Sequence, residues 1–226
     1  MRFDVLTIFP DYLKGPISIG LLGKALHKSL IEINLVNIRD FASDPHHRTD
    51  DEIYGGGAGM VMKPEPIAAA LDHVFLKYPS KPHAIYLSPQ GNPLTQPKVK
   101  ELSQYSNLVL LCGRYEGVDA RVIDGYVDEE ISIGDYVLMG GEVAALVMIE
   151  CVARYVPGVV GKSESVANES FENNRLESPN FTRPRVFQGR EVPSVLTSGD
   201  HKKIENWRKQ EAISKTLRNR PDLLEK

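Results

Sequence analysis

The N-terminal 38 residues alternate short β-rich runs with a stretch of helical spacing. Residues 3–9 form a β-rich run that ends at Pro10, and residues 31–38 alternate polar and apolar positions as a half-buried strand does. Between these runs, leucine and alanine recur at helical spacing from Ile19 to Leu30. The pattern predicts that the chain begins with a β-α-β unit.

Strand-like and helix-like segments continue to alternate as far as residue 155. Helices are predicted at residues 64–78, 96–105 and 142–155, and strands at 84–87, 107–112 and 130–133. The run at 107–112 is almost wholly apolar, which is typical of a parallel strand covered on both faces. The helix at 142–155 is apolar on nearly every side, so it must be buried inside the domain or against a second copy. The order of elements favours an α/β fold with a parallel sheet.

Glycine-rich and polar loops follow three of the predicted strands. They cover residues 88–93, 113–117 and 134–141. In an open parallel sheet the ligand crevice lies outside the carboxyl ends of the strands, so we expect these loops to converge on one pocket. Glycines in such turns expose backbone N–H groups and let a ligand approach the main chain. The long polar connection at 39–63 is expected to be functional or disordered.

The C-terminal part differs from the body in pattern and charge. Residues 157–180 lose periodicity and read as a linker, and a helix is predicted from His201 or Lys202 to about Arg218, with Asp200 as its cap. Residues 171–226 carry a balance of +4, whereas the chain as a whole carries −3. This basic part indicates either contact with a polyanion or a solvated helical surface.

Composition matches a soluble globular protein, with 226 residues, 42% hydrophobic and 25% charged. No apolar run reaches the ~18 residues of a membrane span, and the N-terminus lacks the features of a secretory signal, so a cytoplasmic protein is expected. The two cysteines, Cys112 and Cys151, lie far apart without zinc-site spacing. Neither a disulfide nor a metal site is predicted.

Common nucleotide-binding motifs are incomplete in this chain. The sequence from Gly158 to Ser163 resembles a phosphate-binding loop, but Val156 stands where that motif requires glycine. The glycines at 55–59 do not form a GxGxxG motif. His46 and His47 are adjacent and lack the spacing of a helical metal site; they fit a phosphate contact or a solvated loop equally well.

Several motifs resemble those of the bacterial tRNA (guanine-37-N1) methyltransferases of the SPOUT superfamily. They are Tyr-Gly-Gly-Gly-Ala-Gly-Met (54–60), Tyr-Leu-Ser-Pro-Gln-Gly (86–91), Leu-Cys-Gly-Arg-Tyr-Glu-Gly (111–117) and Ile-Ser-Ile-Gly-Asp-Tyr-Val-Leu-Met-Gly-Gly-Glu (131–142). The likeness continues through 152–161 and 192–199. It implies a parallel α/β sheet with a deep C-terminal trefoil knot, plus a small helical C-terminal domain. The implied domains are a knotted cofactor domain at 1–160, a linker at 161–175 and a tRNA-binding domain at 176–226.

The resemblance also implies a cofactor and its site. S-adenosylmethionine would be bound in a bent form by the three loops. The implied cofactor residues are Tyr86, Leu87, Ser88, Pro89, Gly113, Tyr115, Glu116, Ile133, Gly134, Asp135, Tyr136, Val137, Leu138, Gly140 and Gly141. Members of the family are homodimers with the active site between protomers, which would cover the apolar helix at 142–155.

The implied reaction is methyl transfer to N1 of guanine 37, next to the anticodon, which supports maintenance of the reading frame. N1 carries a proton that a base must remove. The family's base is an aspartate immediately before a Ser-Phe pair, and this chain has Glu169 there, one methylene longer. Arg154 would stabilise negative charge on O6. The tRNA would be held by His46, Asp50, Arg183, Arg185, Lys202, Lys203 and Arg208.

The sequence leaves two other functions open. One is an enzyme that uses ATP or NAD in the same pocket, against which the incomplete motifs argue. The other is a tRNA-binding module without catalysis, against which Arg154 and the carboxylate of Glu169 argue.

Overall fold

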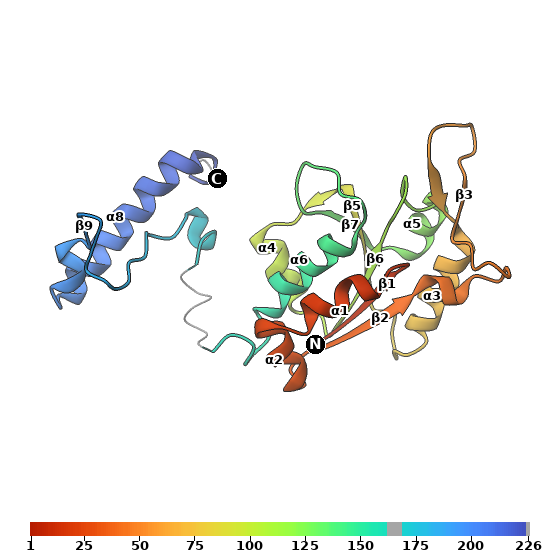
Figure 1. The fold of residues 1–226 in the computed structure, drawn as a ribbon, viewed down its shortest axis with the longest axis horizontal. Coiled ribbons are helices and arrows are strands. Elements are labelled where there is room, and N and C mark those ends of the chain that lie inside the picture. Colours follow the sequence, from red (N-terminus) through yellow and green to blue (C-terminus); the bar gives the residue numbers. More distant parts are fainter. Residues whose placement is uncertain (162–168, 225–226) are drawn as a thin grey trace. The chain divides into compact units, whose positions relative to one another are not determined.

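The computed structural model describes residues 1–161 and 169–224, coloured along the chain in Figure 1. These residues belong to two compact units, Met1–Gly161 and Lys162–Lys226. Each unit has its own secondary structure and is described by itself.

The N-terminal unit is built on a five-stranded parallel sheet. Its strands are β1 (Arg2–Thr7), β2 (Glu32–Asn37), β5 (His83–Pro93), β6 (Asn107–Cys112) and β7 (Glu129–Ser132), in the order β2-β1-β6-β5-β7. All neighbouring pairs in this sheet are parallel. The predicted α/β class and parallel sheet are therefore confirmed.

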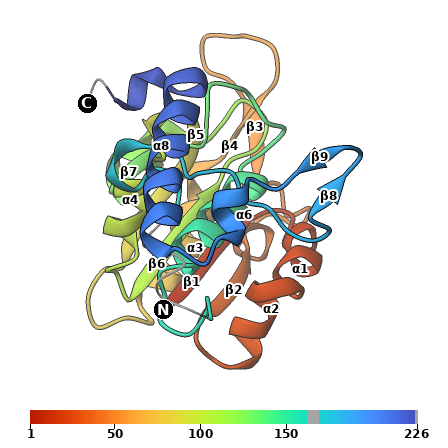
Figure 2. The same cartoon turned by 90° about the vertical axis from the view of Figure 1, so that its left-hand side faces the viewer.

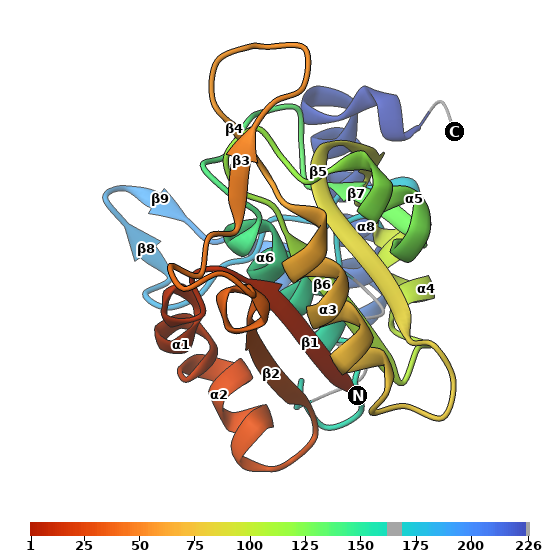
Figure 3. The ribbon, with the colours of Figure 1, turned by 90° about the vertical axis from the view of Figure 1, so that its right-hand side faces the viewer.

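Helices cover both faces of this sheet, and Figure 3 looks onto the face that carries α3. Their bounds are α1 (Asp11–Ile17), α2 (Gly20–His27), η1 (Ile38–Phe41), α3 (Pro64–Phe75), α4 (Gln96–Leu102), α5 (Ala120–Tyr126) and α6 (Glu142–Ala153). Residues of α1, α2, α4 and α6 share one buried cluster, and residues of α3 and α5 share another. Strand β5 serves both clusters, because Ile85 and Leu87 face the first while Ala84 and Tyr86 face the second.

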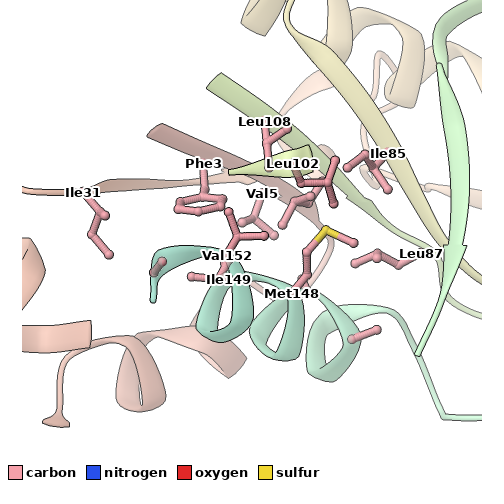
Figure 4. Close-up of a cluster of buried hydrophobic side chains, with 14 of the residues drawn as sticks. Phe3, Val5, Ile31, Ile85, Leu87, Leu102, Leu108, Met148, Ile149 and Val152 are labelled. Atoms are coloured by element: carbon pink, nitrogen blue, oxygen red, sulfur yellow. The ribbon is translucent and has the colours of Figure 1, made fainter. Parts of the chain in front are cut away.

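Helix α6 crosses the middle of the sheet after the edge strand β7. It contacts α1, α4, β1 and β6, and Figure 4 shows Met148, Ile149 and Val152 pointing at side chains of the sheet. The opposite side of α6 carries a stripe that is only partly covered, with Val143 38% exposed. We call this the α6 stripe; it consists of Val143, Leu146, Val147 and Glu150. The predicted burial of this helix inside the domain is therefore confirmed for all of α6 but this stripe.

Within the N-terminal unit one element was missed and one prediction was wrong. Helix α1 was not predicted, because Gly15 and Pro16 interrupt the helical pattern inside it. Residues 88–93 were predicted as a loop, but β5 runs to Pro93 with a register shift after Leu87. Beyond the shift, Pro93 pairs with Ser132, so the segment bulges and then returns to the edge of the sheet.

The predicted long connection at 39–63 contains an antiparallel hairpin. Its strands are β3 (Asp50–Glu52) and β4 (Met60–Met62), and Tyr54 in the glycine-rich turn is 98% exposed. Strand β4 is tied to the loop after β6, since the N–H of Met62 donates to the carbonyl of Gly117 at 2.9 Å. The connection is thus an ordered arm whose base adjoins one of the three loops.

The C-terminal unit holds a hairpin and one long helix, both visible in Figure 2. Its elements are η2 (Glu172–Asn174), β8 (Val186–Phe187), β9 (Arg190–Glu191), η3 (Ser194–Thr197), α8 (His201–Asn219) and η4 (Pro221–Leu223). The Asp200 cap is confirmed, because its carboxylate accepts from the N–H of Lys203 at 3.1 Å. The hairpin was not predicted, since each of its strands has only two residues. Residues 162–168 of the predicted linker lie outside the described residues.

Candidate active site

A cavity of about 270 Å³ lies at the carboxyl ends of β5, β6 and β7. Segments 86–90, 113–117 and 131–141 line it together with Ala144. The residues named from the family resemblance as cofactor contacts all line the cavity except Asp135. The lining also includes residues that were not named as cofactor contacts, which are Gln90, Arg114, Gly117, Ile131, Ser132, Met139 and Ala144. The expected convergence of three chain segments on one pocket is therefore confirmed.

Glycine is required where these segments touch. The N–H of Gly141 donates to the carbonyl of Gly113 at 2.9 Å. A Cβ atom at residue 141 would lie 2.8 Å from the Cα of Cys112, and one at residue 113 would lie 2.7 Å from the hydroxyl of Tyr86. Side chains at either position would push the segments apart, so the pocket depends on both glycines.

The segment after β7 is folded by its own hydrogen bonds. The Ser132 hydroxyl donates to the carbonyl of Gly134 and accepts from its N–H. The ring of Tyr136 lies over Gly134, where a Cβ atom would come within 2.4 Å of it, and its hydroxyl donates to the carbonyl of Ile133. Val137 and Leu138 then stay exposed at the pocket. These residues give the cavity an apolar wall next to backbone polar groups.

Two tyrosines bring polar groups to the pocket. Burial raises the pKa of Tyr86, whose hydroxyl accepts from the backbone N–H of Val118, so it stays protonated at neutral pH. Burial and a hydrogen bond to Asp50 raise the pKa of Tyr115. Asp50, which was expected to contact tRNA, is thereby linked to a residue of the pocket.

An ion pair with a buried carboxylate joins the loop after β6 to the first residue of α6. Arg114 lies 3.1 Å from Oε1 and 2.8 Å from Oε2 of Glu142, through Nε and Nη2 respectively. Glu142 is 1% exposed and also accepts from the Thr7 hydroxyl at 2.6 Å. The Arg114 guanidinium donates to the carbonyl of Met139 at 3.3 Å and lies 4.7 Å from the ring centroid of Phe9. Arg114 therefore clamps the loop after β6 to the start of α6.

The glycine-rich arm reaches the rim of the pocket beside Glu116. The N–H of Glu116 donates to the carbonyl of Met60 at 2.9 Å. A Cβ atom at Gly59 would lie 2.6 Å from the Glu116 side chain. The arm and the pocket therefore form one continuous surface around this carboxylate.

The two residues predicted to be catalytic are not among those that line the pocket. Arg154 caps the C-terminus of α6, whereas Glu142 at the other end of the helix is next to the pocket. Twelve residues of helix separate them by about 18 Å. Glu169 belongs to the C-terminal unit. Within one chain, Arg154 is thus held away from the cavity by the length of its own helix.

The residues predicted to contact tRNA are divided between the two units. His46 is exposed, and Asp50 lies in β3. Arg183, Arg185 and Arg208 line a second cavity, of about 480 Å³, in the C-terminal unit. Lys202 and Lys203 occupy the first turn of α8.

The described ranges hold neither a metal-binding cluster nor a membrane-spanning helix. Among residues 1–161 and 169–224, no group of three or more His, Cys, Asp or Glu side chains could hold a metal ion. None of the helices in the same ranges is long and apolar enough to cross a bilayer.

The parallel sheet with a glycine-lined pocket at the carboxyl ends of its strands defines an α/β protein with a ligand-sized site, and comparison with known proteins gives the family. A model of the family described as tRNA (Guanine-1)-methyltransferase TrmD matches residues 1–226, so the chain belongs to that family. A tRNA (guanine-N(1)-)-methyltransferase of Gloeothece citriformis is 53% identical, covering 100% of this chain and 97% of the relative. One of Endomicrobium trichonymphae is 50% identical over the whole of both chains. The predicted family and its enzyme class are confirmed.

Proposed function

We propose that this protein transfers a methyl group from S-adenosylmethionine to N1 of guanine 37 of tRNA, and so supports reading-frame maintenance. The observation that carries the proposal is the single pocket formed by the three segments that bear the family's motifs. The proposed location of the enzyme is the cytoplasm, where its tRNA substrate is used.

The residues of the pocket suit the proposed cofactor. Its adenine ring needs apolar walls, which Leu87, Ile133 and Leu138 offer, and its polar edge needs backbone groups close at hand. Gly113 and Gly141 leave the main chain accessible there. Glu116 is the carboxylate that lines the cavity and suits a ribose hydroxyl or a positive charge. When bound, S-adenosylmethionine would supply a methyl group made electrophilic by its sulfonium.

The proposed work of the protein is to make N1 of guanine nucleophilic. The carboxylate of Glu169 would accept the N1 proton and so free the electron pair of N1 to bond to the methyl carbon. The bond from that carbon to sulfur would break, and the sulfur would leave with the electron pair as the neutral thioether S-adenosylhomocysteine. The guanidinium of Arg154 donates to O6, where negative charge develops as the proton leaves. A positioned base of this kind accelerates a reaction by roughly 10²–10⁴-fold.

We further infer that the enzyme works as a homodimer, with Arg154 of the partner subunit completing each site. The ~18 Å between Arg154 and the pocket end of its own helix supports this arrangement. So does the α6 stripe, which is apolar at Val143, Leu146 and Val147 and lies on the helix that ends at Arg154. Two such stripes packed across a two-fold axis would bury each other.

The proposed fold within the SPOUT superfamily includes a trefoil knot in the C-terminal part of the N-terminal unit. The match to the family model over residues 1–226 supports it. The tRNA would be held by the exposed arm that carries Asp50 and by the basic residues of the C-terminal unit.

The experiment that tests the function uses methyl-labelled S-adenosylmethionine and tRNA transcripts. One transcript carries guanine at position 37 and the matched control carries adenine there. Label in the first transcript alone is expected, and the product nucleoside should be N1-methylguanosine. Tight binding of both transcripts without label would instead identify a tRNA-binding module and refute the enzyme assignment.

The homodimer has its own test in mixed variants. Arg154→Ala and Gly113→Val are each expected to be inactive. The first variant lacks the cation that would stabilise O6 of guanine, and the second has a blocked cofactor pocket. Mixed and allowed to exchange subunits, they should recover roughly a quarter of wild-type activity, because half the dimers are mixed and each of these has one intact site. No recovery despite proven subunit exchange would contradict a site shared between protomers.

Association itself is tested at the α6 stripe. Val147→Glu places a charge in the proposed interface and should shift the protein to monomers in sedimentation experiments, with loss of methyl transfer. Glu150→Lys is the matched control, because it changes a residue of the same stripe that is already charged. Its effect on association should be smaller. A dimeric and fully active Val147→Glu protein would refute this interface.

A further inference from the structure

The C-terminal unit has a cavity of about 480 Å³ that differs in chemistry from the methyl-transfer pocket. It is enclosed by residues 179–185, Val192, the turn η3 and one face of α8. Its size falls within the ~300–1,000 Å³ typical of small-ligand sites. Its lining consists of Pro179, Asn180, Phe181, Thr182, Arg183, Arg185, Val192, Leu196, Thr197, Ile204 and Arg208. Aspartate and glutamate do not occur among these residues, so the cavity favours an anion.

The three arginines of this cavity keep their charge available. In the part of the chain that the structure describes, none of the three lies within 4 Å of a carboxylate. Other cations of the same unit are paired, such as Lys203 with Asp200 and Lys209 with Glu205. Guanidinium groups match the planar, two-pronged geometry of phosphate oxygens. The cavity therefore holds three guanidinium groups that suit phosphate and are not neutralised by a carboxylate.

The same cavity offers an aromatic surface and hydrogen-bonding groups. Phe181 is 47% exposed, and its ring centroid lies 6.2 Å from that of Trp207 at a tilt of 56°. One face can therefore pack on Trp207 while another part of the ring meets a ligand. The Asn180 amide both donates and accepts, as the edge of a nucleobase does. Unpaired RNA bases are recognised by this combination of stacking and edge contacts, which a base inside a duplex cannot make.

We propose that this cavity accepts one unpaired nucleotide of RNA, with its base against Phe181 and its flanking phosphates on Arg183, Arg185 and Arg208. The inference rests on the proposed tRNA substrate and adds a second, non-reacting anchor for it in the C-terminal unit. The anchor requires a single-stranded nucleotide, so a fully paired stem does not satisfy it.

The chain's single tryptophan gives a direct readout of this site. Trp207 lies next to Phe181, so occupancy of the cavity should change its fluorescence. We expect a saturable change when the full-length protein is titrated with a single-stranded RNA trinucleotide. A fully paired RNA duplex should produce none. Inorganic phosphate should compete with the trinucleotide but bind far more weakly. An equal response to the duplex would overturn the proposal.

Substitutions separate the charge from the base contact. Each phosphate contact to a single strand contributes about 0.7 to the slope of log K against log[salt], so Arg208→Gln should lower that slope by about 0.7. Arg218→Gln removes the same charge from the same helix outside the cavity and should leave the slope nearly unchanged. Equal effects of the two variants would mean a diffuse basic field and would refute the site.

The base contact is tested at Phe181. Phe181→Leu should weaken trinucleotide and tRNA binding by about 5- to 150-fold without changing the salt slope, because base stacking is lost. Phe181→Tyr keeps the aromatic face and should retain binding, which controls for misfolding. Wild-type affinity in the Leu variant would overturn the stacking role.

Methyl transfer measured on the same samples distinguishes the proposed function from the proposed nucleotide site. If the wild-type protein methylates tRNA while the cavity variants bind it normally, only this inference fails. If the trinucleotide binds as expected but no methyl group is transferred, the proposed function fails and the anchor stands.

Discussion

Arg114→Ala should destabilise the N-terminal unit more than any ordinary surface change. Glu142 is 1% exposed, and the substitution leaves its carboxylate buried with the Thr7 hydroxyl as its neighbour. Removing one partner of a buried ion pair costs about 3–5 kcal/mol, because the remaining charge has lost both its solvent and its counter-ion. The Arg114 side chain is 17% exposed, so water can enter the space it leaves. We therefore expect the lower end, about 3 kcal/mol.

Urea unfolding followed by far-UV circular dichroism measures this loss. Since the unfolding free energy falls by about 1–3 kcal/mol per M urea, a loss of about 3 kcal/mol lowers the urea midpoint by roughly 1–3 M. Trp207 lies in the C-terminal unit, so its fluorescence should show an unchanged transition and serves as an internal reference. The slope of the unfolding free energy with urea should stay the same, since the surface exposed on unfolding does not change.

Two matched variants identify the cause. Arg114→Ala combined with Glu142→Gln removes the stranded charge and should recover about half of the lost stability. Arg121→Ala breaks an exposed ion pair with Asp119 and should leave the midpoint nearly unchanged. If Arg114→Ala and Arg121→Ala have equal effects, the buried pair does not clamp the two segments and the reasoning fails.

The remaining predictions concern catalysis, the cofactor and pH. Glu169→Gln should lower kcat by about 10²–10⁴ with unchanged cofactor affinity, while Glu169→Asp keeps activity; rapid turnover by the Gln variant would exclude this residue as the base. Gly113→Ala places a Cβ atom 2.7 Å from the Tyr86 hydroxyl and should weaken cofactor binding about tenfold in calorimetry; wild-type affinity would show that the contact relaxes freely. A hydrogen bond from Arg121 lowers the pKa of Asp119, so its stabilisation is present above about pH 4 and is lost as pH falls through the lowered pKa. Asp119→Asn should remove that part of the acid dependence of unfolding, and an unchanged profile would contradict it.

Much of the pocket could be predicted because its parts are local in sequence. Each of the segments that begin near Ser88, Gly113 and Gly134 combines a strand end with glycine or polar residues, and the parallel sheet brings strand ends to one edge. Arg114 was missed, although it stands between two named residues, because its role depends on Glu142, 28 residues away. Residue spacing does not predict an ion pair between positions so far apart in the sequence.

Other elements were missed because they are short or locally unfavourable. Helix α1 contains Gly15 and Pro16, and tertiary packing of Leu13 and Ile17 outweighs their poor helix propensity. The hairpin β8–β9 has two residues in each strand, too few for an alternating pattern. The bulge in β5 is fixed by pairing with β7, which the residues of β5 cannot reveal by themselves.

The two ends of helix α6 serve different parts of the proposed reaction. Its first residue, Glu142, holds Arg114 at the pocket, and its C-cap is Arg154. About 18 Å of helix separates the two ends, which agrees with the proposal that Arg154 serves the pocket of the partner subunit. The α6 stripe runs along the same helix, and a substitution there should abolish methyl transfer while leaving cofactor affinity intact. A change at Glu142 should do the reverse, weakening the pocket before it affects association. Loss of both properties from either change would mean that pocket and interface are one cooperative unit, rather than two surfaces joined by a helix.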